Sequence, residues 1–113
     1  MAKDDYFVIV YQILSYLYQC LKNGEEIDGK ILAHDSSMLN INKNYWGYIF
    51  VNLQKEQLIE GIEIKKLGNQ YYFGNIKDCC ITPKGIGYLN GNSFIQKAKE
   101  LVKGIAEITP LFK

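Results

Sequence analysis

The amino-acid sequence predicts a mostly helical α+β domain, and three observations lead to that fold class. Two long segments repeat their apolar residues with the period of a helix. A short alternating segment bounded by glycines comes after them and is typical of a strand. A Thr-Pro step then begins further helix. With 113 residues, the chain fits a single core, so we expect one domain over residues 1–113.

The first long segment, residues 5–22, is predicted to be a helix that is buried on most sides. Its polar residues recur at spacings of three and four and indicate one narrow stripe facing solvent: Gln12, Ser15, Gln19 and Lys22. Most other positions are apolar, which is typical of a helix packed against more than one neighbour. Asn23-Gly24 should end the helix, because glycine accepts the left-handed conformation of a C-cap.

Residues 25–41 have a weak pattern that predicts a short helix and a further turn. Asp28 is a candidate N-cap for the short helix, which carries Ile31 and Leu32. Asp35 is a candidate start for another turn, which lies under Met38 and its apolar neighbour.

The second long segment, residues 43–57, is predicted to be a helix with Asn42 as its N-cap. One face is mostly apolar and should pack on the core: Trp46, Ile49, Phe50, Leu53 and Gln57. The opposite face is semi-apolar and carries few charges: Asn44, Tyr48, Val51 and Lys55. We therefore expect this outer face to contact something other than solvent.

A β-hairpin with a long tip is predicted between residues 62 and 82. Residues 62–66 alternate, with Ile62 and Ile64 inward, and residues 76–82 can return as the second strand. Residues 67–70 carry a turn signal. The aromatic run at residues 71–73 can stack on bases, pack a dimer, or pack as core against the first helix.

The last part of the chain predicts two more helices. Thr82-Pro83 should begin a short helix that runs to about Leu89. Residues 93–96 have the form of a capping box that begins a final helix, which Pro110 closes. The expected apolar stripe of this helix is Phe94, Ala98, Leu101, Ile105 and Ile108. The stripe can pack on the first helix, or it can pair with a second copy to form a homodimer.

This order of elements is typical of a winged helix-turn-helix with an added C-terminal helix. In that arrangement the helix at residues 43–57 enters the major groove of DNA and the hairpin reaches the backbone. The candidate DNA-binding residues are Lys43, Asn44, Tyr48, Asn52 and Lys55 on the helix, and Lys65 and Lys66, with Lys77, on the hairpin. The same side chains also fit a solvated surface, or the surface for a protein partner.

The charge composition limits the kind of nucleic-acid contact. The chain has 13 lysines, no arginine and 12 acidic residues, for a net charge of +1, which excludes a strongly basic nucleic-acid packer. Residues 1–40 carry three lysines against six acidic residues, whereas residues 84–113 carry five against two. The middle and the end of the chain are therefore the better candidates for an anionic partner.

No catalytic, metal or cofactor site is expected. His34, the one histidine, stands beside Asp35 and two serines, but triad residues must meet in space, and neighbours in sequence seldom do. Cys20, Cys79 and Cys80 form no CxxC pair, so we expect reduced, buried thiols and no zinc. The N-terminal segment has neither the form of a signal peptide nor that of a membrane span, so a cytoplasmic protein is expected.

Three segments carry a resemblance to a known family. Residues 81–89 (ITPKGIGYL) resemble the segment that follows the wing in many bacterial winged-helix regulators. Together, residues 5–22, 45–61 and 81–93 make the chain similar to the YjcQ family of small phage and prophage proteins from low-GC Gram-positive bacteria. The resemblance implies a winged-helix fold and supplies no catalytic residues. We therefore expect a non-enzymatic, DNA-binding regulatory protein, with a protein-interaction module as the alternative.

Overall fold

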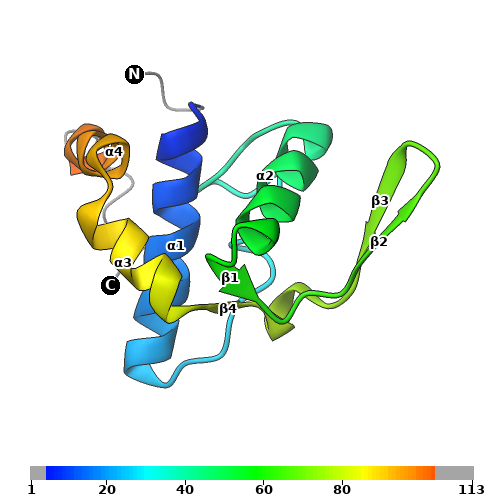
Figure 1. Cartoon of the computed structure of the whole chain (residues 1–113), viewed down its shortest axis with the longest axis horizontal. Coiled ribbons are helices and arrows are strands. Elements are labelled where there is room, and N and C mark those ends of the chain that lie inside the picture. The colour runs from blue at the N-terminus through cyan, green and yellow to red at the C-terminus, as the bar shows by residue number, and fades with distance from the viewer. Residues whose placement is uncertain (1–4, 104–113) are drawn as a thin grey trace.

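The computed structural model describes residues 5–103 and confirms the α+β class. In chain order the elements are α1 (Tyr6–Asn23), α2 (Lys43–Lys55), β1 (Ile59–Glu60), β2 (Ile64–Leu67), β3 (Gln70–Phe73), the short 3-10 helix η1 (Ile76–Asp78), β4 (Cys80–Ile81), α3 (Pro83–Gly91) and α4 (Ser93–Lys103). Helix α1 stands in the middle, with α3 and α4 on one side and α2 on the other (Figure 1). The β2–β3 hairpin projects outward on the side of α2 (Figure 1).

Helix α1 confirms the prediction for residues 5–22, including its end. Gly24 adopts a φ of 66°, and its N–H donates to the carbonyls of Cys20 and Leu21. The predicted solvent stripe is wrong at Gln12, which is 2% exposed. Gln12 lies one turn after Val8, on the side that α4 covers, because Val8 packs with Ala98 and Val102.

Residues 25–41 contain no helix, so the short helix predicted after Asp28 is wrong, whereas the turn predicted at Asp35 is present. The Asp28 carboxylate accepts from the Lys30 N–H at 2.9 Å, and the Ser36 hydroxyl accepts from the Leu39 N–H at 3.1 Å. Such local bonds compete with helical bonding of the backbone. The segment still buries Leu32 in the core.

Helix α2 begins as predicted and keeps its two faces. The Asn42 side chain accepts from the Asn44 N–H at 2.7 Å and caps the helix. The helix ends at Lys55, two residues earlier than expected, because Gln57 has a φ of 63° that no helix allows. The core face is confirmed by three completely buried side chains: Ile49, Phe50 and Leu53. Gln57, which was predicted on this face, is exposed because the helix ends before it.

The predicted hairpin exists, but its second strand lies elsewhere. Strand β2 pairs antiparallel with β3, from Ile64 opposite Phe73 to Leu67 opposite Gln70, and the turn is tight rather than long. Gly68, with a φ of 64°, takes the positive φ that this two-residue turn needs. Of the predicted second strand, residues 76–82, only β4 is a strand, and it pairs with β1 at the base of the hairpin.

The start of α3 is confirmed, whereas the start of α4 differs. The Thr82 hydroxyl accepts from the Gly85 N–H at 2.9 Å, and Pro83 occupies the first turn. Asn92, rather than the predicted Ser93, caps α4. Its side-chain oxygen accepts from the N–H groups of Phe94 and Ile95. The Gln96 amide donates to the Leu89 carbonyl at 2.9 Å instead of closing a capping box.

Helix α4 packs on α1 along a different stripe from the one predicted. Ile95, Ala98 and Val102 are buried, whereas Phe94 is 49% exposed. The Phe94 ring stacks nearly parallel on the Phe7 ring, with 4.8 Å between centroids. Two apolar stripes overlap on this helix, and α1 covers the one that begins at Ile95. The predicted Ile105, Ile108 and Pro110 lie outside the described residues. No helix within residues 5–103 has the length and apolarity to cross a membrane.

Candidate functional site

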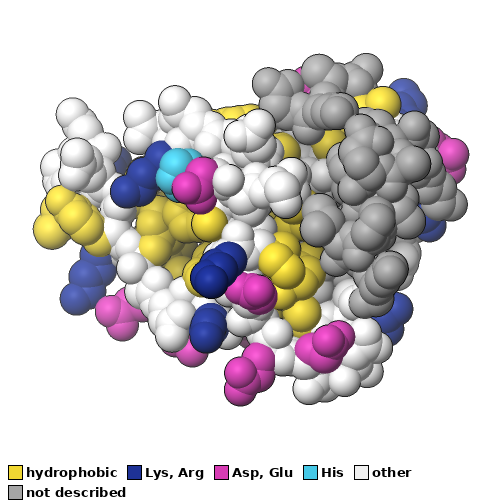
Figure 2. All heavy atoms as spheres, turned by 180° about the vertical axis from the view of Figure 1, so that it is seen from behind, with side chains coloured by type: hydrophobic (Ala, Val, Ile, Leu, Met, Phe, Trp, Pro, Cys, Tyr) yellow, Lys and Arg dark blue, Asp and Glu magenta, His cyan; other side chains and the backbone are white. Residues whose placement is uncertain are grey.

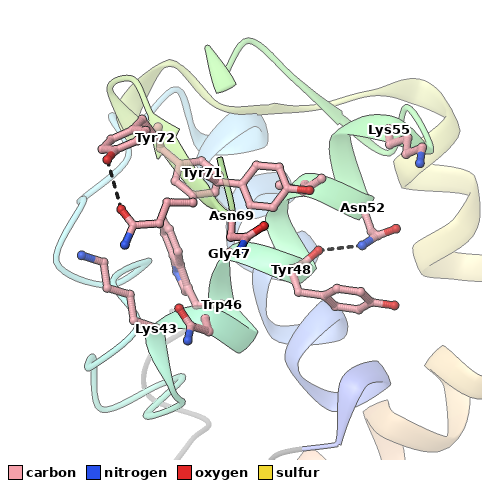
Figure 3. A pocket seen from close by; sticks show the side chains of 13 residues that line it. Lys43, Trp46, Gly47, Tyr48, Asn52, Lys55, Asn69, Tyr71 and Tyr72 are labelled. Atoms are coloured by element: carbon pink, nitrogen blue, oxygen red, sulfur yellow. Dashed lines mark hydrogen bonds between the residues drawn. The ribbon is translucent and has the colours of Figure 1, made fainter. Parts of the chain in front are cut away.

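A groove of about 670 Å³ lies between the outer face of α2 and the hairpin (Figure 3). Helix α2 lines one wall, and residues 69–73 line the other. The predicted DNA-binding residues of the helix all line this groove: Lys43, Asn44, Tyr48, Asn52 and Lys55. They share the groove because their spacing places them on neighbouring positions of one helix face.

The helix wall presents polar side chains between two lysines. Lys43 and Lys55 are the first and last residues of α2, so they lie about 18 Å apart along its axis. Tyr48, between them, is 58% exposed. The Asn52 amide donates to the Tyr48 carbonyl at 2.8 Å, which turns this side chain along its own helix (Figure 3).

The hairpin wall is aromatic and packs on α2 at one end. The Phe73 ring meets the Trp46 ring edge-on, with 5.0 Å between centroids, and lies over Gly47. Tyr71 and Tyr72 are 40% and 51% exposed, so the expectation of core packing against the first helix is wrong for them. Phe73 is anchored, but on α2 rather than α1, because the hairpin stands on the α2 side (Figure 1).

A glutamine ties the base of the hairpin to α2. The Gln54 side chain donates to the Ile62 carbonyl at 2.7 Å and accepts from the Ile62 N–H at 3.0 Å. An amide that bonds both backbone groups of one residue imitates a neighbouring strand. Sequence reasoning missed Gln54, because an isolated glutamine on a helix carries no signal for the segment it binds.

All the charged side chains that line the groove are positive. Its lining contains Lys43 and Lys55 and no carboxylate. On the face seen in Figure 2, lysine and acidic side chains lie interspersed instead. Within this groove, therefore, no lining carboxylate offsets the positive charge of the two lysines.

The predicted hairpin lysines do not line this groove. Lys65 and Lys66 are exposed on β2, where the Lys65 ammonium lies 3.9 Å from the Glu63 carboxylate. The Lys66 ammonium lies over the Tyr71 ring, 5.6 Å from its centroid. Lys77 lines a different depression, beside α1.

His34 and the three cysteines have structural contacts in the fold. The half-buried His34 has its Nδ1 atom 3.2 Å from the Ile41 carbonyl oxygen. All three cysteines are free, and Cys20 and Cys79 are buried as expected, whereas Cys80 is only partly buried. Burial raises the pKa of the Cys79 thiol to about 12, which keeps it protonated and unreactive. Within residues 5–103, no cluster of three His, Cys, Asp or Glu side chains can hold a metal ion.

The profile of the YjcQ protein family matches residues 11–108, which is most of the chain. No curated protein and no solved structure shows significant similarity to the chain. The chain therefore belongs to the YjcQ family.

Proposed function

We propose that this chain is a winged-helix protein that binds double-stranded DNA, with α2 as the recognition helix and the β2–β3 hairpin as the wing. Its role would be regulation, and its origin a phage or prophage, as the family resemblance implies. In this proposal the outer face of α2 enters the major groove, and the hairpin lies against the sugar-phosphate backbone. A helix about 10–12 Å across fits a groove about 12 Å wide.

One observation carries the proposal: the groove beside the exposed face of α2 is lined by lysine, amide and aromatic side chains and by no carboxylate. Duplex DNA carries one negative charge per about 1.7 Å of axis, so a lining carboxylate would oppose it. Lys43 and Lys55 form no ion pair with any side chain of residues 5–103, and their charges remain available for phosphates.

The rival function is docking of a protein partner, and a specific observation favours it. Tyr48, Tyr71 and Tyr72 expose large aromatic surfaces around the same groove. Exposed tyrosines are enriched in protein interfaces. A winged-helix fold is compatible with either partner, because a fold does not fix a function.

Duplex binding measured over a series of salt concentrations tests the proposal. Lys43→Ala and Lys55→Ala should each weaken binding to all sequences and lower the slope of log K against log salt by about one. Lys84→Ala is the matched control, because Lys84 is an exposed lysine on α3 outside the groove. Undetectable binding of any duplex at low salt would overturn the proposal.

A further inference from the structure

The groove contains four amide side chains, and two of them are engaged within the molecule. The Asn52 amide donates to the Tyr48 carbonyl, and the Gln70 carbonyl accepts from the Tyr72 hydroxyl at 3.0 Å. The other two, Asn44 and Asn69, make no side-chain hydrogen bond to any residue in the described part of the chain. Both are exposed, so each keeps a donor and an acceptor available to a ligand.

Asn44 and Asn69 hold different positions in the proposed complex. Asn44 lies in the first turn of α2, and the N-terminal residues of a recognition helix are those that contact base edges. Its backbone N–H is already bound by the Asn42 cap, so the orientation of this turn is fixed. Asn69 lies in the turn of the hairpin. In the proposed complex, the hairpin lies against the sugar-phosphate backbone of the DNA.

An asparagine on the recognition helix favours adenine, and the absence of arginine removes the best partner of guanine. Adenine presents an acceptor and a donor in the major groove, which a single amide satisfies with two bonds. Guanine presents two acceptors, for which the rigid fork of arginine is the best partner. The whole chain has no arginine, and its groove lysines stand at the two ends of α2.

We propose that Asn44 selects A·T base pairs in the major groove, so that the protein prefers duplexes with A·T pairs at the contacted position. This inference rests on the proposed DNA binding and names the residue and the base that give it specificity. The amide of Asn44 would donate to adenine N7 and accept from the adenine amino group. Lys43 and Lys55 would then supply affinity without sequence preference.

The test compares four duplexes with identical flanks and different cores: A·T, G·C, inosine·C, and A·T with 7-deazaadenine. Binding of each duplex is measured by fluorescence anisotropy over the same series of salt concentrations, and the cores are compared at equal salt. The wild type should bind the A·T core at least about fivefold more tightly than the G·C core. Inosine·C should behave as G·C, because the two look alike in the major groove. The 7-deazaadenine core should lose the preference, because it lacks the N7 acceptor.

Three variants assign the preference to its residue. Asn44→Ala should bind the A·T core as weakly as the G·C core, with an unchanged salt slope. Asn69→Ala should weaken both cores equally, since the hairpin is placed on the backbone. Asn90→Ala, an exposed asparagine on α3 outside the groove, should change neither affinity.

Equal binding of A·T and G·C cores by the wild type would overturn the inference while leaving DNA binding intact. So would an inosine·C core that binds like A·T, because that pattern indicates reading of the minor groove. Retained discrimination in Asn44→Ala would also overturn it. Failure to bind all four duplexes at low salt would instead remove the proposed function, and the inference with it.

Discussion

The two faces of α2 differ in almost every property that decides what a surface does. On the inner face, Ile49, Phe50 and Leu53 are completely buried. On the outer face, Tyr48 is 58% exposed, and Lys43 begins the helix in open solvent. The comparison teaches that one helix can contribute stability through one face and leave the other free for a ligand. Substitutions on the two faces should therefore affect different measurements.

The largest expected effect tests the inner face directly. Phe50→Ala should lower the free energy of unfolding by about 3–5 kcal/mol, because it leaves a cavity beside the Trp46 ring, whose centroid lies 4.7 Å away. Tyr48→Ala, on the outer face, should change it by less than about 0.5 kcal/mol. Denaturant unfolding measures both values. Similar losses for the two variants would mean that the faces do not divide their work in this way.

Two glycines in α3 extend the comparison to the contact between α3 and Leu58, the residue that precedes β1. A Cβ added at Gly85 would collide with the Leu58 carbonyl oxygen, so Gly85→Ala should cost about 1–3 kcal/mol. Gly87 has no atom within 4 Å of such a Cβ, so Gly87→Ala should be stabilising by up to about 1 kcal/mol. Thermal unfolding should therefore shift in opposite directions. A stabilised Gly85→Ala would contradict the close approach of α3 to Leu58.

Gln54 connects α2 to the base of the hairpin, and its removal should affect both the stability of the fold and the local exchange of amide protons. Gln54→Ala removes both bonds to the Ile62 backbone and should lower stability by about 1–3 kcal/mol. The Ile62 N–H should then exchange with solvent faster, while the Leu53 N–H inside α2 keeps its protection. Unchanged exchange at Ile62 would show that the hairpin base is held by other contacts.

A further expected effect is a loss of stability at high pH. Burial raises the pKa of the Cys79 thiol from 9.0 to about 12, so the folded state holds its proton when the unfolded state has released it. The stability this group contributes is complete below pH 9 and is lost progressively as the pH rises towards 12. Burial likewise raises the pKa of Tyr16 to about 12. Cys79→Ala should lose less stability than the wild type between pH 8 and pH 10, and an identical loss would contradict this assignment.

The elements that the sequence predicted well have their signals close together in the chain. Gly24 ends α1, Asn42 begins α2, and Thr82 with Pro83 begins α3, because each cap binds backbone groups only a few residues away. The outer face of α2 was predictable for the same reason, since the period of a helix fixes which side chains share a face.

The errors concern positions that depend on distant parts of the chain. Gln12 reads as a solvent-facing residue until α4 covers it, and the buried stripe of α4 depends on where α1 lies. The aromatic run at residues 71–73 reads equally as core or surface, and only the placement of the hairpin decides. Gln54 was invisible for the same reason, since its partner is the backbone of Ile62 in another element.

The most direct test of the central claim is an NMR titration of the folded protein with duplex DNA, read at every backbone amide. The account predicts shift changes concentrated at residues 43–55 and 64–73, and unchanged signals for the buried middle of α1. Changes centred on α3 and α4 would contradict it. So would spectra that do not change at any DNA concentration.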